Sequence, residues 1–351
     1  MKIFETGKHR KYTVSVGSGI FSDAGRLARR YSNAEKVLVV CDENVGPLYC
    51  SELELSLATA GFTVFKHTYP AVAGVKSLDT VSDILLSACE VGMGRNDLFL
   101  ALGGGVCHDL TGLAAALYRR GADFMSIPTS LAAQADGCIG GKADCDLNGF
   151  PDSVGVIKEP IAVLVDVALL NTLPQNRFAE GMAEVIKAAA LGSADLFRRL
   201  AGSAASPELE DIVFESLKYK NRLLGDDSSS ENRRQLLGFG HTVGYAIEKY
   251  YNFSGVTHGE AVSIGMVAIT EASERAGLTV PGTAAELSSC LASYSLPTGT
   301  TIPPATLAEL AVNNIKVRSD TLRIPMISEI GKGFIKTIPA DKLTEFLTGE
   351  K

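Results

Sequence analysis

The stretch Leu98–Tyr118 reads LFLALGGGVCHDLTGLAAALY, and its order of residue types indicates a strand, a glycine turn and a helix. Leu98–Leu102 is an uninterrupted apolar run, which is typical of a strand buried on both faces of a parallel sheet. Gly103–Gly105 let the backbone approach a phosphate closely, and the helix N-terminus that follows favours negative charge. The spacing is not G-x-G-x-x-G, so a tight strand-to-helix turn without a ligand remains the alternative.

Strand and helix patterns alternate on both sides of this stretch. They read KYTVSVGS, FSDAGRLARRY, KVLVVCD, YCSELELSLATAGF, FTVFKHTY and SLDTVSDILLSACEVGM. Such alternation indicates right-handed βαβ units and a parallel sheet. From Leu173 onward the patterns are helical. We therefore expect an α/β fold, with a Rossmann-like parallel-sheet domain over residues 1–174 and an all-helical domain over 175–351. The ligand site is expected in the cleft between them.

Composition excludes several classes of function. The 351 residues carry a net charge of −7 with no basic stripe, which argues against nucleic-acid binding. No apolar run approaches the roughly 20 residues that a membrane helix needs, and the first residues lack the apolar core of a signal peptide. Seven cysteines without a C-x-x-C pair fit a reducing compartment. The expected location is the cytoplasm.

A carboxylate and two histidines in the second half suit one metal ion. Glu184 lies in a helical pattern, FAEGMAEVIKAAAL, while His241 and His258 each open a glycine-flanked apolar helix. Catalytic zinc commonly takes three ligands from Glu and His. A histidine beside glycine is more often a cap or a satisfied core residue, and Glu184 could simply pair with Lys187 three residues on. Spacing alone leaves both interpretations open.

Several motifs in order resemble the dehydroquinate synthase family, the NAD-dependent sugar-phosphate cyclases. They are GGGVCHDLTGLAAALYRRGADF, IPTSL, ADGCIGGK, NTLP, AEGMAEVIK, GFGHTVGYAIE and HGEAVSIGM, and the resemblance runs roughly from Val37 to Lys332. It implies that residues 1–174 bind NAD and that residues 175–351 bind metal and substrate. It also implies a small acidic sugar phosphate as the substrate and a homodimer.

The resemblance assigns roles to individual residues. The metal, expected to be Zn²⁺, is held by Glu184, His241 and His258. The residues implied to bind NAD are Asp42, Lys76, Gly103, Gly104, Gly105, Asp109, Thr129 and Thr172. Those implied to work on the substrate in catalysis are Asp136, Lys142 and Lys187. Lys220 and Arg234 match the pair that holds a carboxylate, for which the alternative is surface solvation, and Arg120 matches an Arg that reaches a neighbouring subunit's phosphate site.

Two positions depart from the family's cofactor motifs. Ala73 stands three residues before Lys76, where family members carry a Glu that accepts a hydrogen bond from the NAD ribose. The loss of such a bond predicts NAD binding weaker by about ten- to a hundredfold. His108 replaces a small residue before Asp109.

The phosphate end of the substrate pocket departs further. Pro151, Asp152, Gly238, Tyr245 and Ile315 replace family phosphate contacts, and the family residue at the position of Tyr245 is a histidine. A phosphate facing Asp152 would meet a like charge. This predicts an acidic substrate whose leaving or anchoring group is smaller or less charged than phosphate, unless neighbouring cations such as Lys158 or Lys316 have taken over the role.

The leading hypothesis is a 3-dehydroquinate synthase-type cyclase, a carbon–oxygen lyase that forms a carbocycle by transient oxidation with NAD at a zinc site. Three alternatives remain open: a related cyclase for another acidic sugar, an NAD-dependent polyol dehydrogenase, and a non-catalytic relic that binds cofactor and metal. Net NADH formation would distinguish a dehydrogenase, and binding without turnover would indicate a relic.

Overall fold

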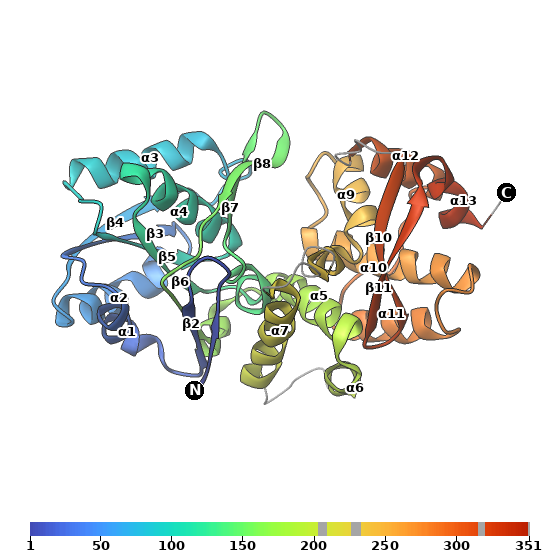
Figure 1. The fold of residues 1–351 in the computed structure, drawn as a ribbon, viewed down its shortest axis with the longest axis horizontal. Helices are drawn as coiled ribbons and strands as arrows, with labels where there is room; N and C mark the ends of the chain where they lie inside the picture. The colour runs from blue at the N-terminus through green and yellow to red at the C-terminus, as the bar shows by residue number, and fades with distance from the viewer. Residues whose placement is uncertain (203–208, 226–232, 315–319, 350–351) are drawn as a thin grey trace. The chain divides into compact units, whose positions relative to one another are not determined.

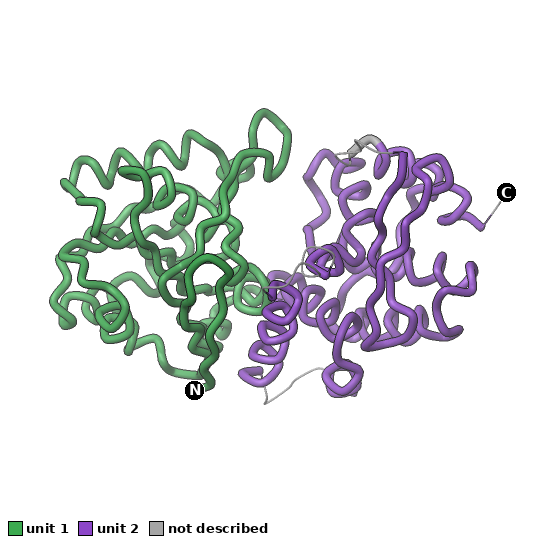
Figure 2. Tube along the Cα trace, in the orientation of Figure 1, with its two compact units in different colours: residues 1–174 green, residues 175–351 purple. Residues whose placement is uncertain are grey.

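The computed structural model describes residues 1–202, 209–225, 233–314 and 320–349. Ile315 and Lys316 lie outside the described residues. The chain forms two compact units, Met1–Pro174 and Gln175–Lys351 (Figure 2). Among the described helices, none is both long and apolar enough to cross a membrane. The assignment of NAD to the first unit, and of metal and substrate to the second, stays a prediction, as does the cleft between them.

A seven-stranded sheet forms the centre of unit 1 (Figure 1). Its strands are β1 (Lys2–Thr6), β2 (Tyr12–Gly17), β3 (Lys36–Asp42), β4 (Thr63–Tyr69), β5 (Leu98–Gly103), β6 (Asp123–Pro128) and β9 (Ala162–Asp166). They lie in the order β1-β2-β9-β6-β5-β3-β4, and only the β1–β2 pair is antiparallel. The predicted Rossmann-like α/β class is confirmed for this unit.

Helices cover both faces of the sheet, which explains why its central strands are apolar throughout. Helices α1 (Ala24–Tyr31) and α2 (Gly46–Thr59) pack on one face, and α3 (Leu78–Glu90) and α4 (Gly105–Leu117) pack on the other. Alternate residues of β3 enter the two cores: Val39 lies in the first and Val40 in the second. A strand buried on both sides has no polar alternation.

A two-stranded hairpin, which the sequence patterns did not reveal, packs beside α4. It comprises β7 (Lys142–Leu147) and β8 (Phe150–Ile157). Gly112 of α4 permits the close approach, because a Cβ there would lie 3.0 Å from the Cβ of Ala143. The short helical segments of this unit are η1 (Phe21–Asp23), η2 (Tyr118–Arg120), η3 (Ala133–Gly137) and η4 (Val167–Thr172).

Unit 2 is mainly helical (Figure 1). Its described helices are α5 (Gln175–Gly192), α6 (Ala194–Gly202), α7 (Leu209–Leu224), η5 (Gln235–Gly238), α9 (His241–Tyr250), α10 (His258–Arg275), α11 (Thr283–Ser293), α12 (Pro304–Asn314), η6 (Ala340–Lys342) and α13 (Leu343–Thr348). The expectation of an all-helical unit needs one correction, because β10 (Thr321–Glu329) and β11 (Lys332–Pro339) form an antiparallel hairpin. Its turn includes Gly331 at φ 89°, a conformation that glycine adopts without strain.

Glycines bring α9 and α10, the two helices that begin with histidine, unusually close together. A Cβ at Gly265 of α10 would lie 2.0 Å from the carbonyl oxygen of Gly240, the residue before α9. A Cβ at Gly244 would lie 3.2 Å from the carbonyl oxygen of Ala261. Because any larger residue would separate the helices, these glycines fix the distance between the two histidine-bearing helix starts.

We predict that Gly265→Ala destabilises the protein by about 1–3 kcal/mol, because an overpacked contact must push the two helices apart. Denaturant unfolding measures the change. Gly202→Ala is the matched control, since a Cβ there would meet no described residue within 4 Å. Equal stability of the two variants would contradict the packing argument.

Candidate functional site

Glu184, His241 and His258 come together in unit 2. They lie on three helices, α5, α9 and α10, and α10 packs against both of the others. Each offers one ligand atom, and these atoms all lie within 4.8 Å of one another. Glu184 is buried, although burial disfavours a carboxylate that lacks cationic partners. One acid and two imidazoles within this distance fit the donor set of a catalytic zinc.

The Nδ1 atom of each imidazole contacts an oxygen atom of the protein. His241 Nδ1 lies 3.3 Å from the carbonyl oxygen of Phe239, and His258 Nδ1 lies 3.1 Å from Glu248 Oε1. Such contacts at Nδ1 select the tautomer whose Nε2 can bind a metal. His258 Nε2 lies 4.0 Å from Glu184 Oε1, on the side where the metal is expected.

Glu248 is a residue of this site that the sequence interpretation missed. It lies seven residues after His241, on the same face of α9, so helical spacing could have found it. Burial lowers the pKa of His258, but the hydrogen bond with Glu248 and the charges of Glu248 and Glu184 outweigh burial and raise it. Glu248 therefore both orients this imidazole and increases its basicity.

Glu184 also forms the ion pair with Lys187 that was the alternative to metal binding. Lys187 Nζ contacts Glu184 Oε2, and both side chains are buried. The two interpretations are compatible, because the other carboxylate oxygen, Oε1, faces His258. Lys187 thus supplies a positive charge beside the metal donors.

Tyr245, one of the departures from the family's phosphate contacts, lies beside both histidines. Its ring centroid is 5.4 Å from that of His241 and 6.0 Å from that of His258. The two imidazoles are themselves 5.1 Å apart in an edge-to-face arrangement. An aromatic ring with a neutral hydroxyl therefore borders the donor cluster at a position that carries a histidine in the family.

The two cations expected to hold a carboxylate also lie in unit 2. Lys220 on α7 is only 9% exposed, so the alternative of simple surface solvation is wrong for this residue. Arg234, just before η5, is half-buried. Helix α7 and η5 both pack against α5, the helix that carries Glu184 and Lys187. The pairing of Lys220 and Arg234 on one carboxylate stays a prediction.

In unit 1 the glycine turn lies at the carboxyl ends of adjacent parallel strands. Asp42 ends β3 and Gly103 ends β5, and a Cβ at Gly103 would lie 4.0 Å from Asp42 Oδ2. The backbone N–H of Thr129 donates to the carbonyl oxygen of Gly103 at 2.9 Å. Gly104 caps α4 without a side-chain hydrogen bond, and a Cβ at Gly105 would meet nothing within 4 Å. An open helix N-terminus of this kind fits a dinucleotide phosphate.

His108 supports this turn from inside the protein. His108 Nε2 lies 3.0 Å from the carbonyl oxygen of Gly103, and Nδ1 lies 2.7 Å from Ser126 Oγ. The imidazole is buried, and burial lowers its pKa to about 4. It is therefore neutral, with Nε2–H donating to Gly103 and Nδ1 accepting from the serine. The side chain of His108 thus points into the core, and its effect on cofactor binding stays a prediction.

Lys76 lies in a cluster with three carboxylates. Its Nζ is 2.8 Å from Asp109 Oδ2 and 2.5 Å from Asp144 Oδ1, and it also contacts Asp152. Burial raises the pKa of Asp109 to about 7, although the charge of Lys76 works in the opposite direction. Asp152 pairs with Lys76, but Lys76 is shared with two further carboxylates, so the expected repulsion of a phosphate stays a prediction. The sequence interpretation missed the pair of Lys76 and Asp152 because the two residues are 76 positions apart in the chain.

The remaining candidate residues of unit 1 are dispersed. Asp136 lies in η3, Lys142 is exposed at the start of β7, and Thr172 bonds to the hydroxyl of Tyr49. Arg120 is exposed, with φ at 67°, and follows Arg119 at φ 47°. Two successive non-glycine residues in this conformation are strained. The structure leaves the roles of these residues as predictions.

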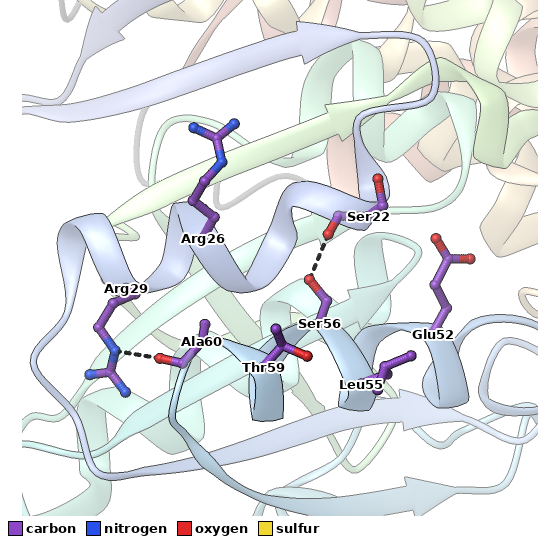
Figure 3. A pocket seen from close by; sticks show the side chains of 8 residues that line it. All are labelled: Ser22, Arg26, Arg29, Glu52, Leu55, Ser56, Thr59 and Ala60. Atoms are coloured by element: carbon purple, nitrogen blue, oxygen red, sulfur yellow. Dashed lines mark hydrogen bonds between the residues drawn. The ribbon is translucent and has the colours of Figure 1, made fainter.

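A pocket of about 550 Å³ lies between α1 and α2, away from every candidate residue (Figure 3). Its lining groups bind one another: Ser56 Oγ donates to the carbonyl oxygen of Ser22 at 2.7 Å, and Arg29 donates to that of Ala60 at 3.0 Å. Arg29 also stacks on Phe62, 3.5 Å from the ring centroid. These contacts join the two helices, and we assign the pocket no ligand.

Family models describe both halves of the chain. The model of the 3-dehydroquinate synthase N-terminal domain matches residues 67–180, and that of the C-terminal domain matches residues 181–317. The 3-dehydroquinate synthase of Clostridium acetobutylicum is 34% identical over 341 residues, which are 96% of each chain. That of Streptococcus sanguinis is 34% identical over 99% of each chain.

Solved structures share the fold over nearly the whole chain. A 2-deoxy-scyllo-inosose synthase complexed with carbaglucose-6-phosphate, NAD⁺ and Co²⁺ superposes with a TM-score of 0.87 at 20% identity, covering 99% of each chain. A 2-epi-5-epi-valiolone synthase from Streptomyces hygroscopicus, with NAD⁺ and Zn²⁺ bound, gives 0.86 at 24% identity, covering 99% of this chain and 98% of that one. A probable glycerol dehydrogenase from Sinorhizobium meliloti gives 0.64 at 17% identity, covering 95% and 94%.

We predict that His258→Ala abolishes tight metal binding and leaves the fold intact, because one of three donors is lost from an exposed helix end. Elemental analysis after dialysis measures occupancy, and circular dichroism checks the fold. Full occupancy in this variant would reject the three-residue site.

We predict that Glu248→Ala weakens metal binding by about ten- to a hundredfold, the usual effect of removing a partner that orients a ligating histidine. Competition with a chelator measures the affinity. Glu248→Gln, which keeps an acceptor for the imidazole, should recover part of the loss. Glu271→Ala, an exposed change on α10, is the control. Unchanged affinity in Glu248→Ala would show that the contact does not orient His258.

We predict a pH dependence of stability from His108. Its pKa is about 4 in the folded protein against an ordinary value of 6.5, so the unfolded chain binds more protons between these limits. Stability is therefore complete above 6.5 and falls as the pH drops towards 4, by up to about 1.4 kcal/mol per pH unit. Urea unfolding at several pH values should show that the free energy of unfolding falls less steeply towards acid pH in His108→Gln than in the wild-type protein. The exposed His9→Gln is the control, and equal slopes in all three proteins would contradict this assignment.

Proposed function

The chain belongs to the 3-dehydroquinate synthase family, and we propose that it is a cyclase that uses NAD and one divalent metal, zinc being the expected ion. The observation that carries the proposal is the cluster of Glu184, His241 and His258. It occurs in a chain that is 34% identical to 3-dehydroquinate synthases along almost its entire length. The proposed product is dehydroquinate, and the substrate is the family's seven-carbon phosphorylated keto acid.

When bound, NAD would supply hydride-transfer chemistry for a transient oxidation, and the metal would supply Lewis-acid chemistry at a hydroxyl oxygen. Glu184 and the Nε2 atoms of His241 and His258 would hold the metal. Glu248 fixes one imidazole and thereby the geometry of the site. Lys187, paired with Glu184 inside the protein, is proposed to stabilise negative charge that develops on a substrate oxygen.

Binding of the substrate's carboxylate is assigned to Lys220 and Arg234. Two observations support this: Lys220 is not an ordinary surface lysine, and its helix α7 packs against α5, which carries Glu184 and Lys187. An arginine can bind a carboxylate through two parallel hydrogen bonds and so orients it. Asp136 and Lys142 are proposed to contact the substrate's hydroxyl groups.

NAD is assigned to the edge of the sheet in unit 1. The proposed contacts are Asp42, Lys76, Gly103, Gly104, Gly105, Asp109, Thr129 and Thr172. The open N-terminus of α4 supports a pyrophosphate position, because backbone N–H groups and the helix dipole favour an anion there.

We also propose a homodimer in the cytoplasm. Arg120 is exposed on a strained turn, and strain of this kind is kept where surrounding structure or function requires it. A role for Arg120 at a neighbouring subunit's phosphate site would account for this.

A second candidate is a cyclase for an acidic sugar that lacks the phosphate. The observation that favours it is Tyr245, whose ring lies beside both metal-site histidines at a position that holds a histidine in the family. A tyrosine hydroxyl is neutral and binds a phosphate dianion less strongly than a cation does. Net formation of NADH would instead indicate a polyol dehydrogenase, and binding of both groups without turnover would indicate a relic.

We predict that the phosphorylated seven-carbon keto acid is converted to dehydroquinate with kcat/KM near or above about 10⁴ M⁻¹s⁻¹, as is usual for an enzyme on its own substrate. Release of inorganic phosphate and formation of dehydroquinate are measured together, and His258→Ala gives the background. A value several orders of magnitude lower, with zinc and NAD bound, would favour the second candidate.

A further inference from the structure

The hairpin β7–β8 is tied to the glycine turn through Lys76. Two of the three carboxylates around this ammonium, Asp144 and Asp152, come from the hairpin, and the third, Asp109, comes from the second turn of α4. Asp152 is therefore linked to α4, the helix that starts at Gly105, through Lys76 and Asp109. Its place beside this helix is set by tertiary contacts rather than by neighbours in the chain.

Asp152 is the accessible member of the cluster. Its side chain is 47% exposed, against 22% for Asp109 and 16% for Asp144. Burial works against its charge, but the charge of Lys76 outweighs burial and holds the pKa of Asp152 below its ordinary value. The pKa of each of the other two carboxyls is raised, chiefly by burial. Asp152 is thus the carboxylate best able to accept a hydrogen bond from a ligand.

The backbone at Asp152 is held in an uncommon conformation. Its φ is 50°, and its N–H donates to Asp146 Oδ1 at 2.9 Å. A non-glycine residue in this region is strained, and strain of this kind concentrates at ligand-binding positions. The conformation coincides with the contact that aims the carboxylate at Lys76.

We propose that Asp152 accepts a hydrogen bond from a ribose hydroxyl of NAD and so replaces the acid that is absent at residue 73. The inference rests on the proposed function, because it requires NAD as the cofactor. An acidic side chain that binds ribose hydroxyls is a general feature of dinucleotide sites in parallel α/β folds. Here the acid comes from the hairpin rather than from the loop before Lys76.

The carboxylate of Asp152 has the chemistry that a ribose hydroxyl requires as donor. Each ribose hydroxyl can donate one hydrogen bond, and a carboxylate accepts it. The three N–H groups of Lys76 already meet three carboxylates, so the contact assigned here is made by Asp152 alone. Ala73, three residues before Lys76, is exposed and has no polar side-chain atom. Asp152 is the most exposed of the three carboxylates that contact Lys76.

Glu43 is the competing acid. It follows Asp42 at the end of β3, is exposed, and accepts a hydrogen bond from the backbone N–H of Ala71 at 3.1 Å. It therefore lies beside the loop that contains Ala73. If Glu43 replaced the missing acid, its removal would weaken NAD binding, whereas removal of Asp152 would not.

Calorimetric titration of NAD into the wild-type protein and four variants tests the proposal. Asp152→Asn should weaken binding by about ten- to a hundredfold. Ala73→Glu alone should change it by less than about threefold, because an acceptor is already present. The double variant Asp152→Asn/Ala73→Glu should recover most of the loss, and Glu43→Gln, the matched control, should bind like the wild type. Such non-additivity is the signature of two residues that serve one contact.

Several outcomes would overturn the proposal. Wild-type affinity in Asp152→Asn would show that its carboxylate is not a ligand, and tighter binding by Ala73→Glu alone would show that the acceptor is missing. A loss in Asp152→Asn that Ala73→Glu does not rescue would indicate a purely structural role for the ion pair. These results leave NAD as the cofactor. Absence of NAD binding in the wild-type protein would instead reject the cofactor in the proposed function.

Discussion

The close packing of α10 against α9 and α5 is the constraint on which the metal site depends. His241 and His258 begin their helices, so their separation is the separation of two helix starts. Gly240, Gly244 and Gly265 set it by admitting backbone where a Cβ would collide. Glu184 then completes the donor set from a buried position. A site built on rigid helices holds its ligands in place before the metal arrives, which lowers the cost of binding.

In unit 1, the charged groups near the glycine turn are paired with one another. Lys76 would be an isolated cation beside the glycine turn, yet three carboxylates surround it, and two come from a hairpin. Deeper in the same unit, His108 supports the turn as a neutral donor and acceptor, because a buried imidazolium would be costly there. The carbonyl oxygen of Gly103, on the inner side of the turn, is thus hydrogen-bonded within the protein, while the outer side is available to a ligand.

The family of the chain and its departures from the family are compatible. The cluster of possible metal donors, the buried cations and the glycine turn are consistent with the proposed cyclase, and Tyr245 borders the cluster. Asp152, which by itself suggests repulsion of a phosphate, has a cationic partner in Lys76. In the role proposed for Asp152, its charge bears first on the cofactor and only indirectly on the substrate. The effect of Asp152 on NAD binding and its effect on the substrate must therefore be measured separately, the first as NAD affinity and the second as turnover.

Periodicity and motif order in the sequence determined the α/β class, the mainly helical second unit and the glycine turn, since each is encoded by residues close together in the chain. The resemblance named Glu184, His241 and His258 as candidate metal donors, and only the fold brings these three distant residues together. Tertiary structure alone decided the hairpins β7–β8 and β10–β11, whose short strands carry little periodic signal. It also decided that His108 points inward and that Lys76 meets Asp152, 76 residues away. An ion pair between distant residues depends on how helix and hairpin pack, and no local pattern records that packing.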